Sequence, residues 1–179
     1  MYINTEEKGH RHSDPTDPLR PWANKRCGHG TWDTDRVPVG GVVGRTNGQV
    51  RLRVLHHSNG VELRALGESA STIGRVFNTD EWRGYNWVAG SGRGHKTVCH
   101  APGVREWARD DDGDGVREVH VNTIEGLWTG VRNFVRPFRG INKKYLSQYM
   151  AVFEWAHNLK AVIPELIHMM LMPFTLKPT

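Results

Sequence analysis

The sequence predicts an α/β domain in which strands and helices follow one another in mixed order. Three observations support this class. Two strand-like runs, 37–43 and 49–55, flank Asn47-Gly48, which is a strong signal for a β-hairpin. A further strand-like run, 75–79, comes directly before an acidic pair. Apolar residues then recur at helical spacing from Ile124 onward.

The remaining elements follow from local patterns. Residues 61–70 predict a helix, 81–88 a short aromatic-rich helical turn, and 95–100 a short strand. In the late helix the apolar residues that share one face are Ile124, Leu127, Trp128, Val131 and Val135. Pro137 disrupts this helix and Gly140 separates it from a second one. The second helix ends near Asn158, and its apolar residues are Leu146, Tyr149, Met150 and Phe153.

Composition limits the class of protein. The chain has 179 residues, a net charge of +5 and 37% hydrophobic residues, which suits one domain with a core and favours polyanionic partners. A mildly basic enzyme without such a partner is the alternative. The chain contains no apolar run of transmembrane length, no secretory pattern and only two cysteines, so we expect a cytoplasmic protein without disulfides.

We expect the chain to have three parts. Residues 1–36 are rich in Pro, His and basic residues, which is typical of an arm or a long inserted loop. Residues 37–158 carry the regular patterns and are expected to form the domain proper. Residues 159–179 form an apolar C-terminal tail.

Two acidic residues are candidates for holding a metal ion. Asp80 follows the strand predicted over 75–79, where a carboxylate can point into a cleft beside a sheet. Glu125 borders the apolar stripe of the late helix, and Arg132, seven residues later, shares its side. Mg²⁺ prefers carboxylate oxygens. Two alternatives stay open: Asp80 caps the following turn, and Glu125 and Arg132 are solvated residues beside a core stripe.

Several segments together resemble the ISXO-like transposases of bacterial insertion sequences. They are TDEWRGY at 79–85, HKTVCH at 95–100 and HVNTIEGLWTGVRNFVRPFRGINKKYLSQY at 120–149. The segment ANKRCGHGTWDTDRVPVGGVVGR at 23–45 is similar to the family's insert and second strand. The resemblance implies a DDE-superfamily domain with a ribonuclease-H-like fold, in which helices flank a mixed sheet.

The resemblance also implies roles for individual residues. Asp80 is then the second catalytic aspartate and Glu125 the catalytic glutamate, and both bind Mg²⁺ or Mn²⁺. His120 and Asn122 support the start of the helix that carries the glutamate. The implied activity is metal-dependent phosphoryl transfer on DNA, at transposon ends and target, by a transposase that assembles with itself. The implied DNA-binding residues are Arg132, Arg136, Arg139, Lys143 and Lys144.

The start of the chain departs from the family pattern. The family carries its first catalytic aspartate in an Asp-Glu pair on the central first strand, just before a segment similar to MYINTEEKG at 1–9. We therefore expect the first strand to be largely missing and this truncated form to be inactive. A longer reading frame and a decayed gene both remain open as explanations. The alternative function is a non-catalytic remnant that binds DNA or an intact transposase.

Other residues fit weaker hypotheses. His95, His100 and His120 are candidates to meet near the site, although single histidines are more often satisfied surface or core groups. The acidic run 110–115 matches the first half of a calcium loop, but Val121 stands where a bidentate glutamate is required. A solvated acidic turn is therefore the favoured interpretation.

Overall fold

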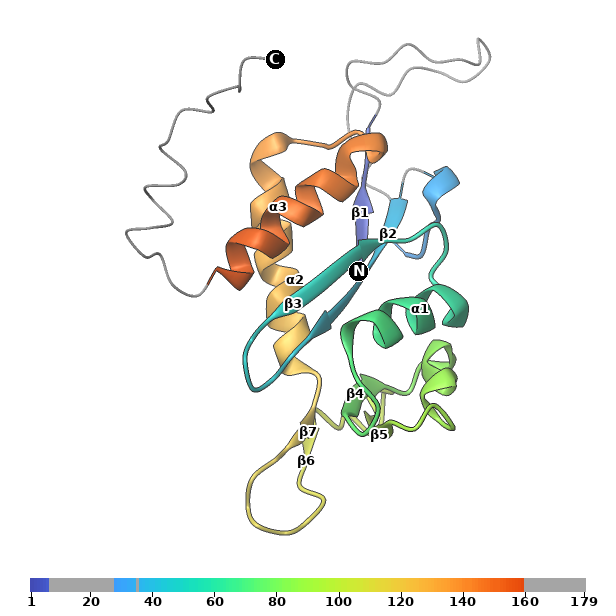
Figure 1. Ribbon diagram of the computed structural model, residues 1–179, viewed down its shortest axis with the longest axis vertical. Coiled ribbons are helices and arrows are strands. Elements are labelled where there is room, and N and C mark those ends of the chain that lie inside the picture. Colours follow the sequence, from blue (N-terminus) through green and yellow to red (C-terminus); the bar gives the residue numbers. More distant parts are fainter. Residues whose placement is uncertain (7–27, 35, 160–179) are drawn as a thin grey trace, which may run out of the picture.

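A three-stranded antiparallel sheet carries helices on both of its faces (Figure 1). Its strands, in spatial order, are β1 (Tyr2–Asn4), β2 (Arg36–Val43) and β3 (Val50–Val54). The computed structural model describes residues 1–6, 28–34 and 36–159. Most of the expected N-terminal arm and nearly all of the expected C-terminal tail lie outside the described residues.

Two smaller sheets complete the strand pairing. β4 (Val76–Asp80) and β5 (Gly94–Val98) are parallel, whereas β6 (Ala108–Arg109) and β7 (Val119–His120) are antiparallel. The expected α/β class, with both kinds of pairing, is confirmed. The ribonuclease-H-like assignment remains a prediction, because the described pairing is divided among three sheets.

The helices lie close to where the sequence places them. The α-helices are α1 (Gly60–Ala70), α2 (Asn122–Val135) and α3 (Leu146–Asn158). The short 3-10 segments are η1 (Trp32–Thr34), η2 (Arg83–Val88), η3 (Arg136–Phe138) and η4 (Lys143–Tyr145). Pro137 lies in η3, directly after α2, so the expected break is confirmed. Within the described residues, no helix combines the length and the apolar character that crossing a bilayer requires.

The β2–β3 hairpin turns at Asn47-Gly48, as expected. Gly48 has a φ of +65°, a conformation that glycine adopts without strain, and its amide donates to Gly44 O at 2.7 Å. The side chain of Asn47 accepts from the amide of Gln49 at 3.0 Å. These contacts fix the register of β2 against β3 and thereby which residues face each helix.

Two glycines in β2 allow helices to approach both faces of the sheet. A Cβ on Gly41 would lie 2.5 Å from the ring of Trp128 in α2, and one on Gly40 would lie 2.9 Å from Leu66 in α1. Successive residues of a strand point to opposite faces, so the two contacts place α2 and α1 on opposite sides. The main core lies between the sheet and the α2–α3 pair; its buried residues include Val37, Val39, Leu127, Val131, Leu146 and Met150.

The chain begins with a strand that sequence patterns did not indicate. Met1 and Val39 exchange two backbone hydrogen bonds, at 3.1 and 2.8 Å, and β1 continues this antiparallel pairing. Glu6 is only 2% exposed, and its amide donates to Ile141 O. The chain therefore begins with a short strand, and the expectation that the family's first strand is largely missing stays a prediction.

Side chains of α3 cover the outer edge of β3. Asn158 accepts from the amide of Val50 at 2.7 Å and donates to its carbonyl at 2.9 Å. One turn earlier, Glu154 accepts from the amide of Leu52 at 2.7 Å and pairs with Arg51. The helix thus satisfies backbone groups that an edge strand otherwise leaves without partners.

Changing Asn158 to alanine should remove both contacts with Val50. Because Val50 is 1% exposed, its amide and carbonyl lose their partners in a buried setting. We expect the free energy of unfolding to fall by about 1–3 kcal/mol, measured by urea denaturation followed by circular dichroism. The control Glu68→Ala removes an exposed pair with Arg64 and should cost about 0.5 kcal/mol or less. Equal losses for the two variants would contradict this role of Asn158.

Candidate active site

The parallel strands β4 and β5 place Asp80 at one edge of their sheet. Asp80 ends β4 and pairs with Val98, which ends β5, so the residues that follow both strands meet at this edge. Ligand sites are common at the carboxyl ends of parallel strands. Asp80 is exposed, and its Oδ1 accepts from the amide of Trp82 at 3.1 Å. This local contact fits the capping interpretation, but a carboxylate has about four acceptor positions and can also bind a metal.

A small apolar cluster fixes where α2 begins. Val98, Val119 and Val121 are buried together, and Ile124 packs against them. The next residue, Glu125, lies in the first turn of α2 with its side chain 50% exposed. A negative charge is stabilised near a helix N-terminus. The cluster therefore holds Glu125 close to the end of β5.

His100 connects the end of β5 with α2. Its Nδ1 lies 3.9 Å from Glu125 Oε1, and its Nε2 is buried without a hydrogen-bond partner in the described part of the chain. His100 follows Val98, the partner of Asp80, by two residues. The structure therefore brings Asp80, His100 and Glu125 to the same edge of the β4–β5 sheet.

Arg132 and Asp80 both act on the amine of Met1. The pKa of this amine is lowered to about 6: burial is the largest cause, the charge of Arg132 adds to the lowering, and the charge of Asp80 opposes it. The charges of the expected carboxylate and of the expected phosphate-binding arginine therefore both influence the amine at the start of the chain.

Aromatic residues of η2 lie beside Asp80. Burial raises the pKa of Tyr85 to about 12, and the charge of Asp80 contributes to the rise. Trp82 contacts Tyr85 edge to face, with ring centroids 5.6 Å apart. The phenol is therefore neutral at ordinary pH and does not add a second negative charge beside Asp80.

His120, which was expected to support the start of α2, contacts the β2–β3 turn. Arg45 donates through Nη2 to His120 Nε2 at 2.8 Å and through Nη1 to Glu118 O. Burial lowers the pKa of His120, and Arg45 lowers it further. Asn122 is exposed, and the residue before it, Val121, makes no side-chain cap bond. Within the described residues, apolar packing and the Arg45–His120 bond support the helix start.

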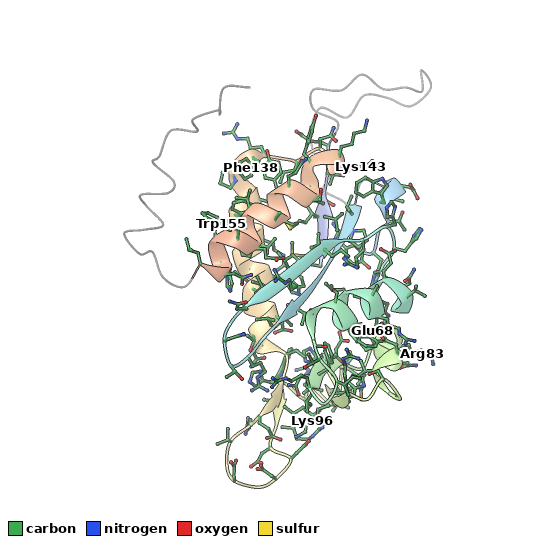
Figure 2. The ribbon with its side chains drawn as sticks, viewed as in Figure 1. Glu68, Arg83, Lys96, Phe138, Lys143 and Trp155 are labelled. Carbon is green, nitrogen blue, oxygen red and sulfur yellow. The ribbon has the colours of Figure 1, made fainter. Side chains whose placement is uncertain are left out.

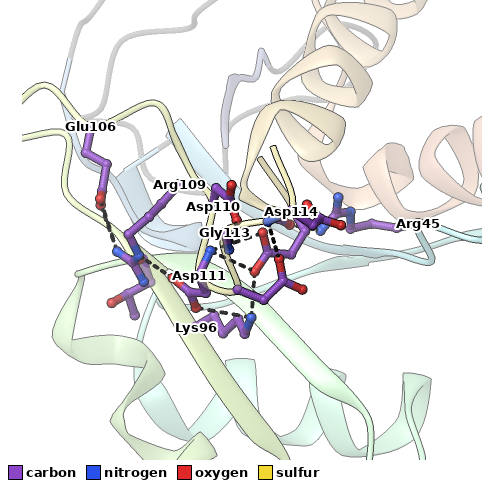
Figure 3. Close-up of polar contacts among 11 residues, drawn as sticks. Arg45, Lys96, Glu106, Arg109, Asp110, Asp111, Gly113 and Asp114 are labelled. Atoms are coloured by element: carbon purple, nitrogen blue, oxygen red, sulfur yellow. Dashed lines mark hydrogen bonds and ion pairs between the residues drawn. The ribbon is translucent and has the colours of Figure 1, made fainter. Parts of the chain in front are cut away.

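Backbone amides and basic side chains bind the carboxylates of the acidic loop (Figure 3). Asp110 accepts two amides at 2.7 and 2.9 Å, and these bonds lower its pKa. Lys96 bridges Asp111 at 3.1 Å and Glu118 at 2.8 Å. Three acidic side chains have one oxygen each within 4.8 Å of the others: Asp110, Asp112 and Glu118. Such clusters are common without an ion, so the loop agrees with a solvated acidic turn.

The expected DNA-binding residues divide into two groups. Arg132 lies within α2, two turns after Glu125, whereas Arg136, Arg139 and Lys144 are exposed beyond the end of α2. Lys143 is half-buried, and its Nζ donates to Trp32 O at 3.0 Å. Figure 2 shows Phe138 and Lys143 at the opposite end of the molecule from Lys96. At 1.5 Å per residue, Glu125 and Arg136 lie roughly 16 Å apart along α2.

Sequence reasoning missed two contributors to this region. A three-residue strand such as β1 is too short to show an alternating pattern, so the position of Met1 gave no signal. Arg45 meets His120 across 75 residues, and no local spacing connects them. The one feature of the sequence that hints at this contact is the position of Arg45, a basic residue in a tight hairpin turn.

Comparisons with known proteins bear on this region as a whole. Residues 6–158 match the family model described as the ISXO2-like transposase domain. The chain is also 25% identical, over 155 residues, to a protein in the transposable element ISH50 of Halobacterium salinarum. That match covers 86% of this chain and 49% of the relative, so the chain spans about half the relative's length. No solved structure matches.

Changing His120 to glutamine should weaken the dependence of stability on pH. The pKa of His120 is held below its usual value of about 6.5, so the unfolded chain binds more protons below that pH. The contribution of His120 to stability is therefore full above about pH 6.5 and is lost as the pH falls towards the folded pKa. Thermal melts from about pH 5 to pH 8 should show a shallower slope for the variant.

Glutamine can still accept the hydrogen bond from Arg45, so the fold should persist. The control is His57→Gln, because His57 is exposed. A slope for His120→Gln that equals the slope of the unmodified protein would exclude this linkage.

Proposed function

Because this chain belongs to the ISXO2-like transposase domain family, we propose that it acts in DNA transposition as the catalytic domain of a DDE transposase with a ribonuclease-H-like fold. The proposed reaction is phosphoryl transfer on the DNA of an insertion sequence. The relative in the transposable element ISH50 supports this assignment. Because the chain covers about half of that relative, the activity of a whole transposase is part of the proposal.

One observation carries the proposal: the carboxylates of Asp80 and Glu125 lie at the carboxyl edge of β4–β5. Asp80 ends β4, Glu125 lies 3.9 Å from His100, two residues after the end of β5, and Arg132 follows Glu125 by two turns of α2. Phosphoryl transfer needs carboxylates for metal ions and a cation for the phosphate. The three side chains come from β4 and α2, elements that lie well inside the described part of the chain.

The donor set fits Mg²⁺ or Mn²⁺. Both candidate ligands, Asp80 and Glu125, offer hard carboxylate oxygens, and within the described residues neither forms an ion pair with lysine or arginine. A divalent ion bound by them would activate a water or a 3′-hydroxyl for in-line attack at phosphorus. Arg132 would bind non-bridging phosphate oxygens, and the neutral Tyr85 would avoid repelling the phosphate.

A third carboxylate belongs to the proposed site. Met1 N donates to Val39 O, so a residue joined to Met1 would extend β1 alongside β2, and the charges of Asp80 and Arg132 both affect the pKa of the Met1 amine. We propose that the Asp-Glu pair of the family is supplied at that position in a longer form of the chain. Two carboxylates alone hold Mg²⁺ weakly, since this ion is usually bound by carboxylates together with waters and substrate phosphates.

Removing either carboxylate should abolish strand transfer by a chain extended with Asp-Glu before Met1. Asp80→Asn and Glu125→Gln should each lower the rate by at least about a hundredfold, because each removes a metal ligand worth several kcal/mol of barrier. Gel assays of strand joining, with the ends of the encoding element and Mg²⁺ or Mn²⁺, measure the rate. The matched control is Asp112→Asn, an exposed acidic residue of the loop, which should keep full activity.

A rate for Asp80→Asn or Glu125→Gln within a few-fold of the control would refute the assignment of the site. An unextended chain that joins strands as fast as the extended one would refute the third carboxylate.

The second candidate function is a non-catalytic module that binds DNA or an intact transposase. The exposed basic residues beyond α2 favour it, because they need no metal to bind phosphates: Arg136, Arg139 and Lys144. Such a module binds DNA with steep salt dependence but never joins strands, even when extended.

Changing Arg132 to glutamine should weaken DNA binding equally for all sequences. A phosphate contact releases about 0.9 counterion, so the slope of log K against log salt should become shallower by about 0.9. Fluorescence anisotropy of a labelled duplex, measured across a salt series, gives the slope. The control Arg64→Gln removes a basic residue that pairs with Glu68 on α1 and should leave the slope unchanged. Equal slopes for the two variants would exclude a phosphate contact by Arg132.

A further inference from the structure

Trp107 is a large apolar side chain exposed beside the candidate site. Its indole is 56% exposed, and its ring centroid lies 4.8 Å from that of His100, with the ring planes inclined at 55°. His100 in turn lies 3.9 Å from Glu125. The exposed indole is therefore only one side chain away from a proposed metal ligand.

The loop that carries Trp107 is tied down on both sides. Glu106 accepts from the amide of Cys99 at 3.1 Å and donates its own amide to Cys99 O at 2.8 Å. Arg109 donates to both carboxylate oxygens of Glu106 at 3.1 Å and to Thr97 O at 3.0 Å. The hydrogen bonds thus hold the loop that carries the exposed indole in place. A ligand that binds the indole therefore loses little free energy to ordering the loop.

Charge near Trp107 does not exclude a polyanion, although the loop that follows is acidic. Asp111 pairs with Arg109 at 2.5 Å and with Lys96 at 3.1 Å, so its charge is compensated. Two residues before Trp107, Arg105 is exposed. A nucleic acid strand can therefore approach the indole without meeting uncompensated charge from Asp111.

We propose that Trp107 stacks on an unpaired nucleobase next to the phosphate that reacts at the site of Asp80 and Glu125. This inference rests on the proposed function and adds a binding site for the base to it. Every base has a π-face, so stacking on an indole tolerates all sequences and selects an unpaired base over a paired one. The strand that binds is therefore DNA whose bases have left the double helix near the reacting phosphate.

Trp107 differs in its surroundings from another exposed tryptophan, Trp155. Trp155 is 53% exposed but lies on α3, in a groove with Leu52 and Ala151. No carboxylate proposed to hold a metal contacts it within the described residues. Trp155 therefore serves as a control with the same side chain and nearly the same exposure.

The test compares two single strands that carry the same charge. One is an oligonucleotide of about sixteen nucleotides, and the other has the same sugar-phosphate backbone without bases. Anisotropy without added metal measures the affinity of the full chain and of the variants Trp107→Ala, Trp107→Phe and Trp155→Ala. We expect Trp107→Ala to lose roughly 5- to 100-fold in affinity for the strand with bases and nothing for the abasic strand.

Trp107→Phe should restore most of the affinity, and Trp155→Ala should bind like the unmodified protein. Equal losses of Trp107→Ala on both strands, or no loss on either, would overturn the stacking role and leave the proposed function intact. Failure of the unmodified protein to bind either strand would overturn the proposed function together with this inference.

Discussion

Packing of α2 against the end of β5 is the constraint on which the candidate site depends. Ile124 packs against the buried cluster of Val98, Val119 and Val121, and this packing holds the first turn of α2 beside the end of β5. The helix backbone determines where the exposed side chain of Glu125 lies relative to the edge at which Asp80 ends its strand. The apolar packing of Ile124 therefore determines where the carboxylate of Glu125 lies.

Much of the fold follows from local patterns. Asn47-Gly48 specifies its own turn, and the stripe that includes Leu127 and Val131 specifies which side of α2 is buried, so sequence reasoning found both. The elements that it missed depend on distant partners. β1 forms because Met1 and Val39 exchange backbone hydrogen bonds. The three residues of this strand carry no local pattern that could predict a partner so far along the chain.

The residues of the candidate site fall into the same two groups: those that local patterns indicate and those that depend on distant partners. In the sequence, the end of a predicted strand indicated Asp80, and helical spacing indicated that Glu125 and Arg132 share one side of a helix. The proximity of His100 to Glu125 and the bond of Arg45 to His120 come from tertiary packing. Both histidines have a buried ring nitrogen without a partner in the described residues, a cost that local sequence does not reveal.

The cover that α3 provides for β3 has a consequence beyond the stability of the native state. A strand edge with open amides and carbonyls is a template for a strand from another molecule. Asn158 occupies the two groups of Val50 that such a strand would use, and Glu154 occupies the amide of Leu52. Local opening of α3 would therefore uncover a strand edge that can pair with another molecule, so we expect loss of this helix to promote self-association as well as unfolding.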